Sequence, residues 1–263
     1  MNTVLSKDGT RIAYDKLGQG PALILVAGAL CARLSWSGPQ LSELLAPHFT
    51  VYNYDRRGRG DSGDQQPYAI QREVEDIQVL IAEAGGSACL YGHSSGGALV
   101  LQAAAGLGNQ VKKLAVYEAP YNDDPQAQRS WAEYIRNLTD LLAANRPGDA
   151  AALFMKYVGA PPEQIEGMRQ SPAWSFMEQI APTLAYDHTA LMGSTNTIPT
   201  ALVVRISSPA LVISGDAGLP FMQVTARSLS RIIPHAELRI LPGQTHDVDP
   251  QVLAPVLQEF FEK

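Results

Sequence analysis

Short, wholly apolar runs recur along the chain, and each is separated from the next by a segment long enough to form a helix. A run of this length without polar alternation is typical of a strand that is buried on both faces. Strands that alternate with helices form parallel sheets covered by helices on both sides. We therefore predict an α/β protein built on a mostly parallel sheet, with central strands at 22–26, 49–54, 88–91, 114–117 and 210–213.

Three further strands complete a predicted sheet of eight. The stretch VLSKDGTRIAY gives two short extended pieces around Asp8-Gly9, which is a hairpin signal. The last strand, 236–241, alternates apolar and charged residues, so we expect it to be half exposed at the sheet edge. Apolar residues follow one helical stripe in 70–84 and again in 252–261, so both segments should be helices that pack on the sheet.

The regular alternation stops after Pro120 and resumes near Pro209. The chain between them indicates several short helices, broken at Pro147-Gly148, Pro161-Pro162 and Pro172. We predict a helical cap inserted after the sixth strand, so that the domains are an α/β core of 1–120 and 204–263 and a cap of 121–203. Aromatic side chains of the cap are expected to form its own core and to line an apolar pocket, Trp131 and Trp174 among them.

Charge and composition exclude several classes of partner. The net charge is −6, and the one basic cluster, at 56–59, is flanked by aspartates, so nucleic acid is not an expected partner. No apolar run approaches the roughly 20 residues that span a bilayer, and the N-terminus has no export signal. We therefore expect a cytoplasmic protein, away from membranes, in which Cys31 and Cys89 stay thiols. No His, Cys or carboxylate spacing predicts a metal site.

The stretch LYGHSSGGALV places Ser94 between two glycines, where an apolar strand must turn within a residue or two into a helix. Such a turn forces the serine into a strained backbone conformation, and the crowding around it explains Gly92 and Gly96. Ser94 would then project at the carboxyl edge of the sheet, where α/β sheets bind their ligands. Ser94 is therefore the candidate nucleophile.

A nucleophilic serine needs a histidine as base and an acid that orients it. Two histidines flank the last strand: His235 precedes it, at the end of the sheet opposite Ser94, and His246 follows it, at the same end as Ser94. We predict that His246 is the base. The remaining histidines are set aside because they lie beside the nucleophile, before the strand at 49–54, or in the cap: His93, His48 and His188.

These features together resemble the α/β-hydrolase superfamily over nearly the whole chain. The resemblance rests on the elbow GHSSGG, the loop DRRGRGDS at 55–62, the cap after the sixth strand and the histidine after the eighth. It implies that the backbone N–H groups of Ala29 and Ser95 form an oxyanion hole, although Ala27 replaces the usual histidine of that loop. For the 55–62 loop we expect charged side chains that cross-brace a turn beneath the site, without a catalytic role.

The acid departs from the commonest pattern of the superfamily, because Gly218 stands at the usual position after the seventh strand. Glu118, at the end of the sixth strand, and Asp216, directly after Gly215, remain as alternatives. We favour Glu118, since some haloalkane dehalogenases that the chain resembles carry their acid after that strand. Strand six neighbours strand five, so this carboxylate should lie close to Ser94.

The resemblance implies a serine hydrolase that needs no cofactor and cleaves an ester or related acyl bond of a small, fairly apolar substrate through an acyl-enzyme. Carbon–carbon bond hydrolases and cofactor-free perhydrolases, also called haloperoxidases, use the same triad and are alternatives. Dehalogenases and epoxide hydrolases are disfavoured because they place an aspartate where this chain has Ser94. A small-molecule receptor that keeps the fold without turnover is the alternative from another class.

Overall fold

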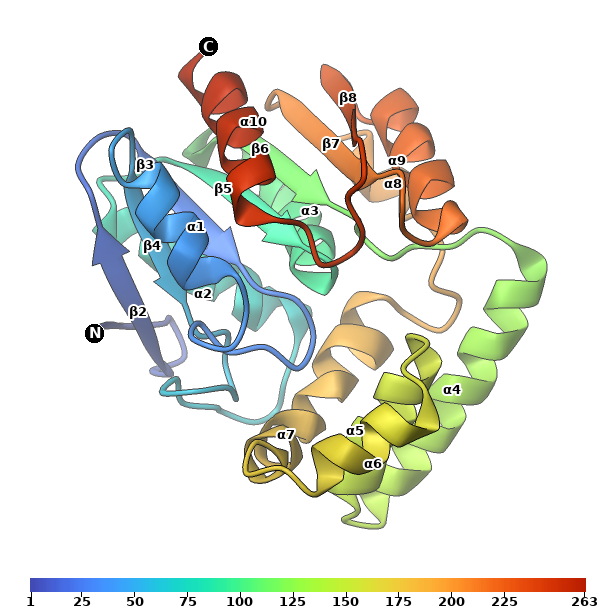
Figure 1. Ribbon diagram of the computed structural model, residues 1–263. Helices are drawn as coiled ribbons and strands as arrows, with labels where there is room; N and C mark the ends of the chain where they lie inside the picture. Colours follow the sequence, from blue (N-terminus) through green and yellow to red (C-terminus); the bar gives the residue numbers. More distant parts are fainter.

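The computed structural model describes residues 1–263 and contains one eight-stranded sheet, with the strand order β1-β2-β4-β3-β5-β6-β7-β8 (Figure 1). The strands from β3 onwards pair in parallel, and β2 runs antiparallel to both of its neighbours. The predicted mostly parallel sheet is therefore confirmed. Its strands are β1 Asn2–Leu5, β2 Arg11–Leu17, β3 Ala22–Val26, β4 Thr50–Tyr54, β5 Ala88–His93, β6 Val111–Tyr117, β7 Ala210–Gly215 and β8 Ala236–Leu241.

Both faces of the sheet are covered by helices, which explains the continuous apolar runs. Alternate residues of β3 point to opposite faces: Leu23 and Leu25 belong to one buried cluster, and Ile24 and Val26 belong to the other. Helices α1 (Gly38–Leu45) and α10 (Pro250–Glu262) cover the first face. The second face is covered by α2 Ile70–Glu83, α3 Ser95–Leu107 and α9 Pro220–Ile232.

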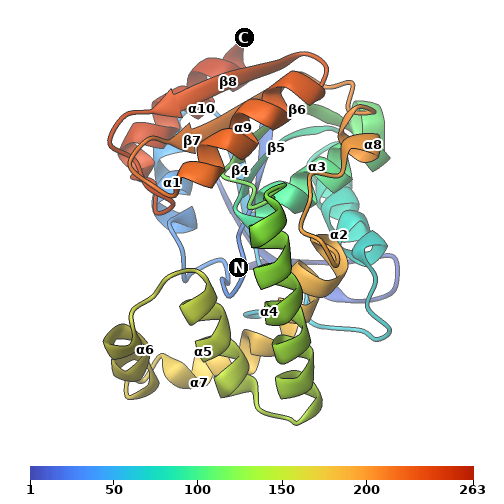
Figure 2. The ribbon, with the colours of Figure 1, turned by 90° about the vertical axis from the view of Figure 1, so that its right-hand side faces the viewer.

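The segment between β6 and β7 is helical, as expected, and its α4 to α7 lie together to one side of the sheet (Figures 1 and 2). One of these helices is not short: α4, Pro125–Ala143, spans 19 residues. It begins after the N-cap Asp124, with Pro125 in its first turn, and no proline or glycine interrupts it before Ala143. The remaining elements are α5 Pro147–Tyr157, α6 Pro162–Arg169, α7 Trp174–Ile180, a 3₁₀ turn Ala181–Thr183, a π-helical segment Ala185–Leu191 and α8 Thr200–Val203.

The two chain crossings between the sheet and these helices lie side by side. The Asn122 N–H donates to the Asn196 carbonyl over 2.8 Å, and the Asn196 side chain donates to the Pro120 carbonyl over 2.9 Å. The division into a core of 1–120 and 204–263 and a cap of 121–203 stays a prediction. None of the helices is long and apolar enough to cross a membrane. Both cysteines are free thiols.

Candidate active site

Ser94 occupies a sharp turn between β5 and α3, with φ 56° and ψ −126°. This is the left-handed half of backbone space, which is costly for a residue with a side chain. The flanking glycines permit the turn, because a Cβ on Gly92 would collide with the carbonyl of Gly96, and a Cβ on Gly96 would collide with the carbonyl of Val26. The local sequence thus forms the strained elbow that the motif predicts.

Glu118 and His246 are brought together by the chain reversals after β6 and β8. The Nδ1 of His246 lies 2.8 Å from Oε2 of Glu118, whose side chain is fully buried. The other carboxylate oxygen of Glu118 accepts hydrogen bonds from the Ser214 hydroxyl at 2.9 Å and the Gly215 N–H at 3.0 Å. Both of these donors belong to the end of β7.

The environment of Glu118 fixes the tautomer of His246. Burial raises the pKa of the Glu118 carboxyl, but the hydrogen bond from His246 and those from β7 outweigh burial and hold the pKa below its ordinary value. An ionised carboxylate only accepts hydrogen bonds, so Nδ1 of His246 carries the proton. The lone pair of Nε2 is then free to take a proton from a nucleophile.

Asp216, the alternative acid, lies elsewhere. Its side chain is exposed and accepts a hydrogen bond from the Gly243 N–H at 2.6 Å, within the turn that follows β8. It makes no hydrogen bond with His246, whose Nδ1 is bonded to Glu118. The geometry therefore favours Glu118 of the two carboxylates.

His93, the residue that precedes the nucleophile, contacts His246. The His93 and His246 rings have centroids 4.8 Å apart, and Nε2 of His93 lies 2.8 Å from the His246 carbonyl oxygen. The Ser94 hydroxyl and the His246 ring are not joined by a hydrogen bond in this structure. Such bonds are often long in enzymes without substrate and tighten in the reacting complex.

The two expected oxyanion donors lie on either side of Ser94. Ala29 follows β3, and its N–H has no acceptor within the protein. Ser95 is the first residue of α3, where backbone N–H groups have no intrahelical acceptor. The loop before Ala29 packs closely on the nucleophile, since a Cβ on Gly28 would lie only 3.1 Å from Cβ of Ser94. Both N–H groups are thus available to an anion that forms at Ser94.

The arginines of the 55–62 loop reach much further than a local brace. Arg56 forms two hydrogen bonds with Glu73 of α2, at 2.7 and 2.8 Å. Its Nη1 lies 2.7 Å from Oδ1 of Asp187, and Nη2 of Arg59 lies 2.6 Å from Oδ2 of the same carboxylate. Asp187 belongs to the π-helical segment, so the expectation of a brace confined to the turn is incomplete.

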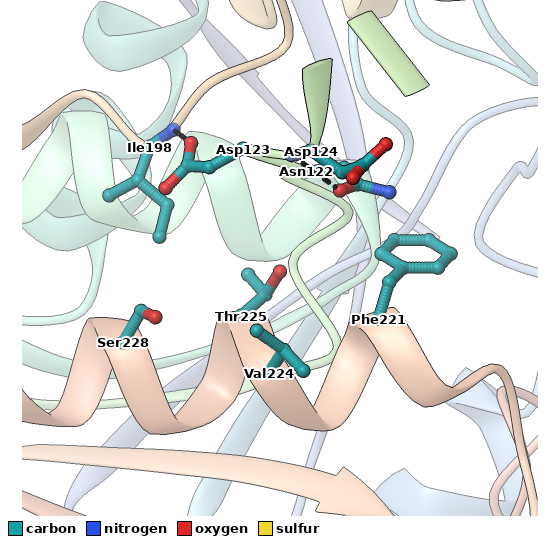
Figure 3. A pocket seen from close by; sticks show the side chains of 8 residues that line it. All are labelled: Asn122, Asp123, Asp124, Ile198, Phe221, Val224, Thr225 and Ser228. Carbon is teal, nitrogen blue, oxygen red and sulfur yellow. Dashed lines mark hydrogen bonds between the residues drawn. The ribbon is translucent and has the colours of Figure 1, made fainter. Parts of the chain in front are cut away.

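A cavity of about 360 Å³ lies away from these residues (Figure 3). It opens where the crossing at 122–124 and Ile198 pass over α9, and its polar side chains are largely engaged with the protein itself. Asp124 caps α4, and Oδ1 of Asp123 accepts the N–H of Ile198. Its lining residues are Asn122, Asp123, Asp124, Ile198, Phe221, Val224, Thr225 and Ser228. No candidate catalytic side chain contributes to it.

Comparison with known proteins identifies the family. A model described as the alpha/beta hydrolase family matches residues 23–256. The chain is an α/β hydrolase. It is 48% identical to an α/β hydrolase of known structure from Sphaerobacter thermophilus DSM 20745, with a TM-score of 0.87 over 99% of this chain and 100% of that one. The protein is thus an enzyme, and the family match agrees with the fold predicted from its sequence.

Two curated relatives are more distant. The human protein named serine hydrolase BPHL is 24% identical over 249 residues, which cover 92% of this chain and 78% of that protein. Bifunctional epoxide hydrolase 2 of Sus scrofa is 29% identical over 122 residues, 45% of this chain, and the match covers 22% of that protein's length.

Two parts of the hydrolase site were not predicted from its sequence. His93 was set aside because it lies beside the nucleophile, yet its ring contacts His246; burial, together with the neighbouring His246 imidazole, lowers the pKa of His93 to about 4, so His93 is neutral near pH 7. Asp187 carried no motif at all. The only sequence signal for it was the surplus of arginines in the 55–62 loop, which needed more acidic partners than the loop itself supplies.

Proposed function

We propose that this α/β hydrolase cleaves an ester or related acyl bond of a small, fairly apolar substrate, with Ser94 as nucleophile, His246 as base and Glu118 as orienting acid. The observation that carries this proposal is the 2.8 Å hydrogen bond between Glu118 and Nδ1 of His246, beside the strained Ser94 elbow. A serine hydroxyl becomes reactive when a base of this kind removes its proton.

In the proposed reaction, Nε2 of His246 takes the Ser94 proton while the serine oxygen bonds to the substrate carbonyl carbon. The carbonyl oxygen becomes an oxyanion, which the N–H groups of Ala29 and Ser95 stabilise. His246 then gives its proton to the departing alcohol, and the acyl group stays on Ser94. Water then attacks the acyl carbon while His246 takes its proton; the bond from the Ser94 oxygen to the acyl carbon breaks, His246 returns the proton to Ser94, and the acid is released.

We further propose that residues 121–203 act as a cap that shapes the acyl site. Support comes from an aromatic cluster in this segment: Trp131 and Phe154 pack against the ring of His188, with centroids 5.3 and 5.2 Å away. His188 follows Asp187, whose carboxylate accepts the Ser95 hydroxyl at 2.8 Å. An apolar acyl group bound at Ser94 would therefore lie near these rings.

A series of nitrophenyl esters of increasing acyl length, assayed with wild type and Ser94→Ala, tests the proposed function. We expect hydrolysis of short-chain esters that is lost in Ser94→Ala. Equal rates for the two proteins would exclude Ser94 as nucleophile, and binding of esters without turnover by wild type would favour the receptor alternative.

A further inference from the structure

The peptide group that carries one oxyanion donor, the Ala29 N–H, is hydrogen-bonded by the buried guanidinium of Arg59. Nη1 of Arg59 donates to the Gly28 carbonyl over 2.7 Å. The Gly28 carbonyl and the Ala29 N–H belong to the same planar peptide group, in which they point in opposite directions. A guanidinium that fixes the carbonyl therefore fixes the direction of the Ala29 N–H, and it also polarises that N–H as a donor.

The second donor is held by the same buried network. The Ser95 hydroxyl donates to Oδ1 of Asp187 at 2.8 Å and lies 3.2 Å from Nη1 of Arg56. Oδ2 of Asp187 accepts from Arg59 at 2.6 Å. One carboxylate thus contacts the side chain of Ser95 directly and reaches the Gly28–Ala29 peptide through one arginine.

Asp187 is the acidic partner on which this arrangement depends. Its side chain is fully buried, as is that of Arg56, and Arg59 is 1% exposed. Arg56 is also paired with Glu73, whereas Arg59 has Asp187 as its only ion-pair partner. Burial raises the pKa of Asp187, but the charges of Arg56 and Arg59 outweigh burial and lower it to about 2, so the carboxylate is ionised near neutral pH.

We propose that Asp187 is a positioning residue of the oxyanion hole, which orients the Ala29 N–H through Arg59 and the Ser95 N–H through the Ser95 hydroxyl. This inference rests on the proposed function of those two N–H groups. Asp187 lies in the π-helical segment between β6 and β7, so the oxyanion hole is complete only when that segment is seated on the loops beside Ser94. If Asp187 had only a structural role, its substitution would lower stability but would leave kcat of the folded enzyme unchanged.

The test compares 4-nitrophenyl butyrate with its thionoester, in which sulfur replaces the carbonyl oxygen. Sulfur is a weak hydrogen-bond acceptor, so the oxyanion hole assists the thionoester less. Asp187→Asn should lower kcat for the oxygen ester at least about tenfold, below the 10²- to 10³-fold loss typical of a missing oxyanion donor, with KM little changed. The thionoester rate should fall much less, so the ratio of the two rates should drop.

Asp187→Asn leaves Arg59 unpaired in a buried site and can fail to fold. Ser95→Ala is therefore the second variant, since it keeps the backbone N–H and removes only the hydroxyl, with its contacts to Asp187 and Arg56. We expect the same selective loss, smaller in size. Tyr186→Phe is the matched control: the Tyr186 hydroxyl joins the same π-helical segment to Asp64 over 2.6 Å, outside the Asp187 network. This control should keep the wild-type ratio of rates.

A second readout does not depend on turnover. The amide ¹H–¹⁵N resonance of Ala29 should shift in Asp187→Asn and in Ser95→Ala, that of Ser95 should shift in Asp187→Asn, and both should stay in place in Tyr186→Phe. Unchanged amide shifts together with a wild-type rate ratio, in any folded Asp187→Asn or Ser95→Ala protein, would overturn the inference. Failure of the proposed function is recognised separately, because Ser94→Ala would then hydrolyse both esters at the wild-type rate.

Discussion

At the scale of single residues, two residues of the proposed triad have strained backbone conformations. Ser94 has φ 56° at the end of β5, and Glu118 has φ 47° directly after β6. Neither residue is glycine, so each conformation costs about 1–3 kcal/mol that the surrounding structure must supply. The turns direct both side chains to the carboxyl edge of two neighbouring strands, which are paired in parallel.

The triad acid can be identified by conservative substitution. Glu118→Gln keeps the shape of the side chain but removes the charge that holds His246 in its tautomer, so we expect turnover to fall by up to about 10⁴-fold, as in other triads. Asp216→Asn should keep near-normal turnover, because Asp216 bonds the Gly243 N–H and not His246. Steady-state kinetics on folded variants measure both effects, and a severe loss in Asp216→Asn alone would reverse the assignment.

His188 predicts a pH dependence of stability. Burial lowers the pKa of His188 from 6.5 to about 4; the Asp187 carboxylate opposes this shift, and the charges of Arg59 and Arg56 add to it. Nδ1 of His188 lies 2.8 Å from the Tyr134 hydroxyl. Between pH 6.5 and pH 4, His188 is protonated in the unfolded chain but stays neutral in the folded chain. Stability from His188 is therefore complete above pH 6.5 and is lost as the pH falls towards 4, by up to about 3 kcal/mol.

Urea unfolding at pH 7 and pH 4.5 measures this effect. His188→Gln should reduce the difference between the two pH values by most of that amount. His235→Asn, a change at an exposed histidine with φ 57°, is the control and should leave the difference unaltered. An unchanged pH dependence in His188→Gln would show that His188 does not titrate in this range.

At the scale of elements, the strands and most helices were predictable because their signals are local. The run at 22–26 forms β3 with those same bounds, and the half-exposed edge strand predicted at 236–241 is β8. The apolar stripe of 70–84 became α2, yet Glu73 and Asp76 of that helix are also buried. The apolar periodicity of a helix does not predict this burial, because the arginine partners of these carboxylates lie in the 55–62 loop.

The residues of the candidate site could likewise be proposed from sequence only where they left a local signal. Ser94 and His246 could be proposed from motif and order along the chain, and Glu118 from the adjacency of strands five and six. Asp187 could not, because it contacts Arg59 across 128 positions of sequence. A contact of that range leaves no local pattern, and only the folded chain reveals which carboxylate the arginine meets.

The helical segment gives a prediction about selectivity. Trp131 packs against His188 and donates to the Gly193 carbonyl over 2.8 Å, whereas Trp174 of α7 lies against the Arg169 guanidinium, 4.9 Å from its ring centroid. Trp131→Leu should therefore change the preferred acyl length by several-fold in kcat/KM, whereas Trp174→Leu should not. Both variants should lose stability, by less than the roughly 3–5 kcal/mol typical of a Trp→Ala change. The ester series measures preference, and thermal unfolding measures stability. A selectivity change in Trp174→Leu alone would contradict this view of the cap.

At the scale of the whole molecule, the site is assembled from segments that are distant in sequence. Ser94 follows β5, Glu118 follows β6, His246 follows β8 and Ala29 follows β3. All of these strands run in parallel, so their carboxyl ends meet at one edge of the sheet, where ligands of open α/β sheets bind. The π-helical segment adds Asp187 from outside the sheet.

The most direct test of the central claim, that Ser94 is the nucleophile of a triad with His246 and Glu118, is covalent labelling with diethyl 4-nitrophenyl phosphate. Wild type should release nitrophenol and gain one diethylphosphoryl group per chain, which mass spectrometry of peptides should locate on Ser94. Glu118→Gln should be labelled far more slowly, and Ser94→Ala should not be labelled. A label on another residue, or ester hydrolysis that continues in Ser94→Ala, would contradict the account.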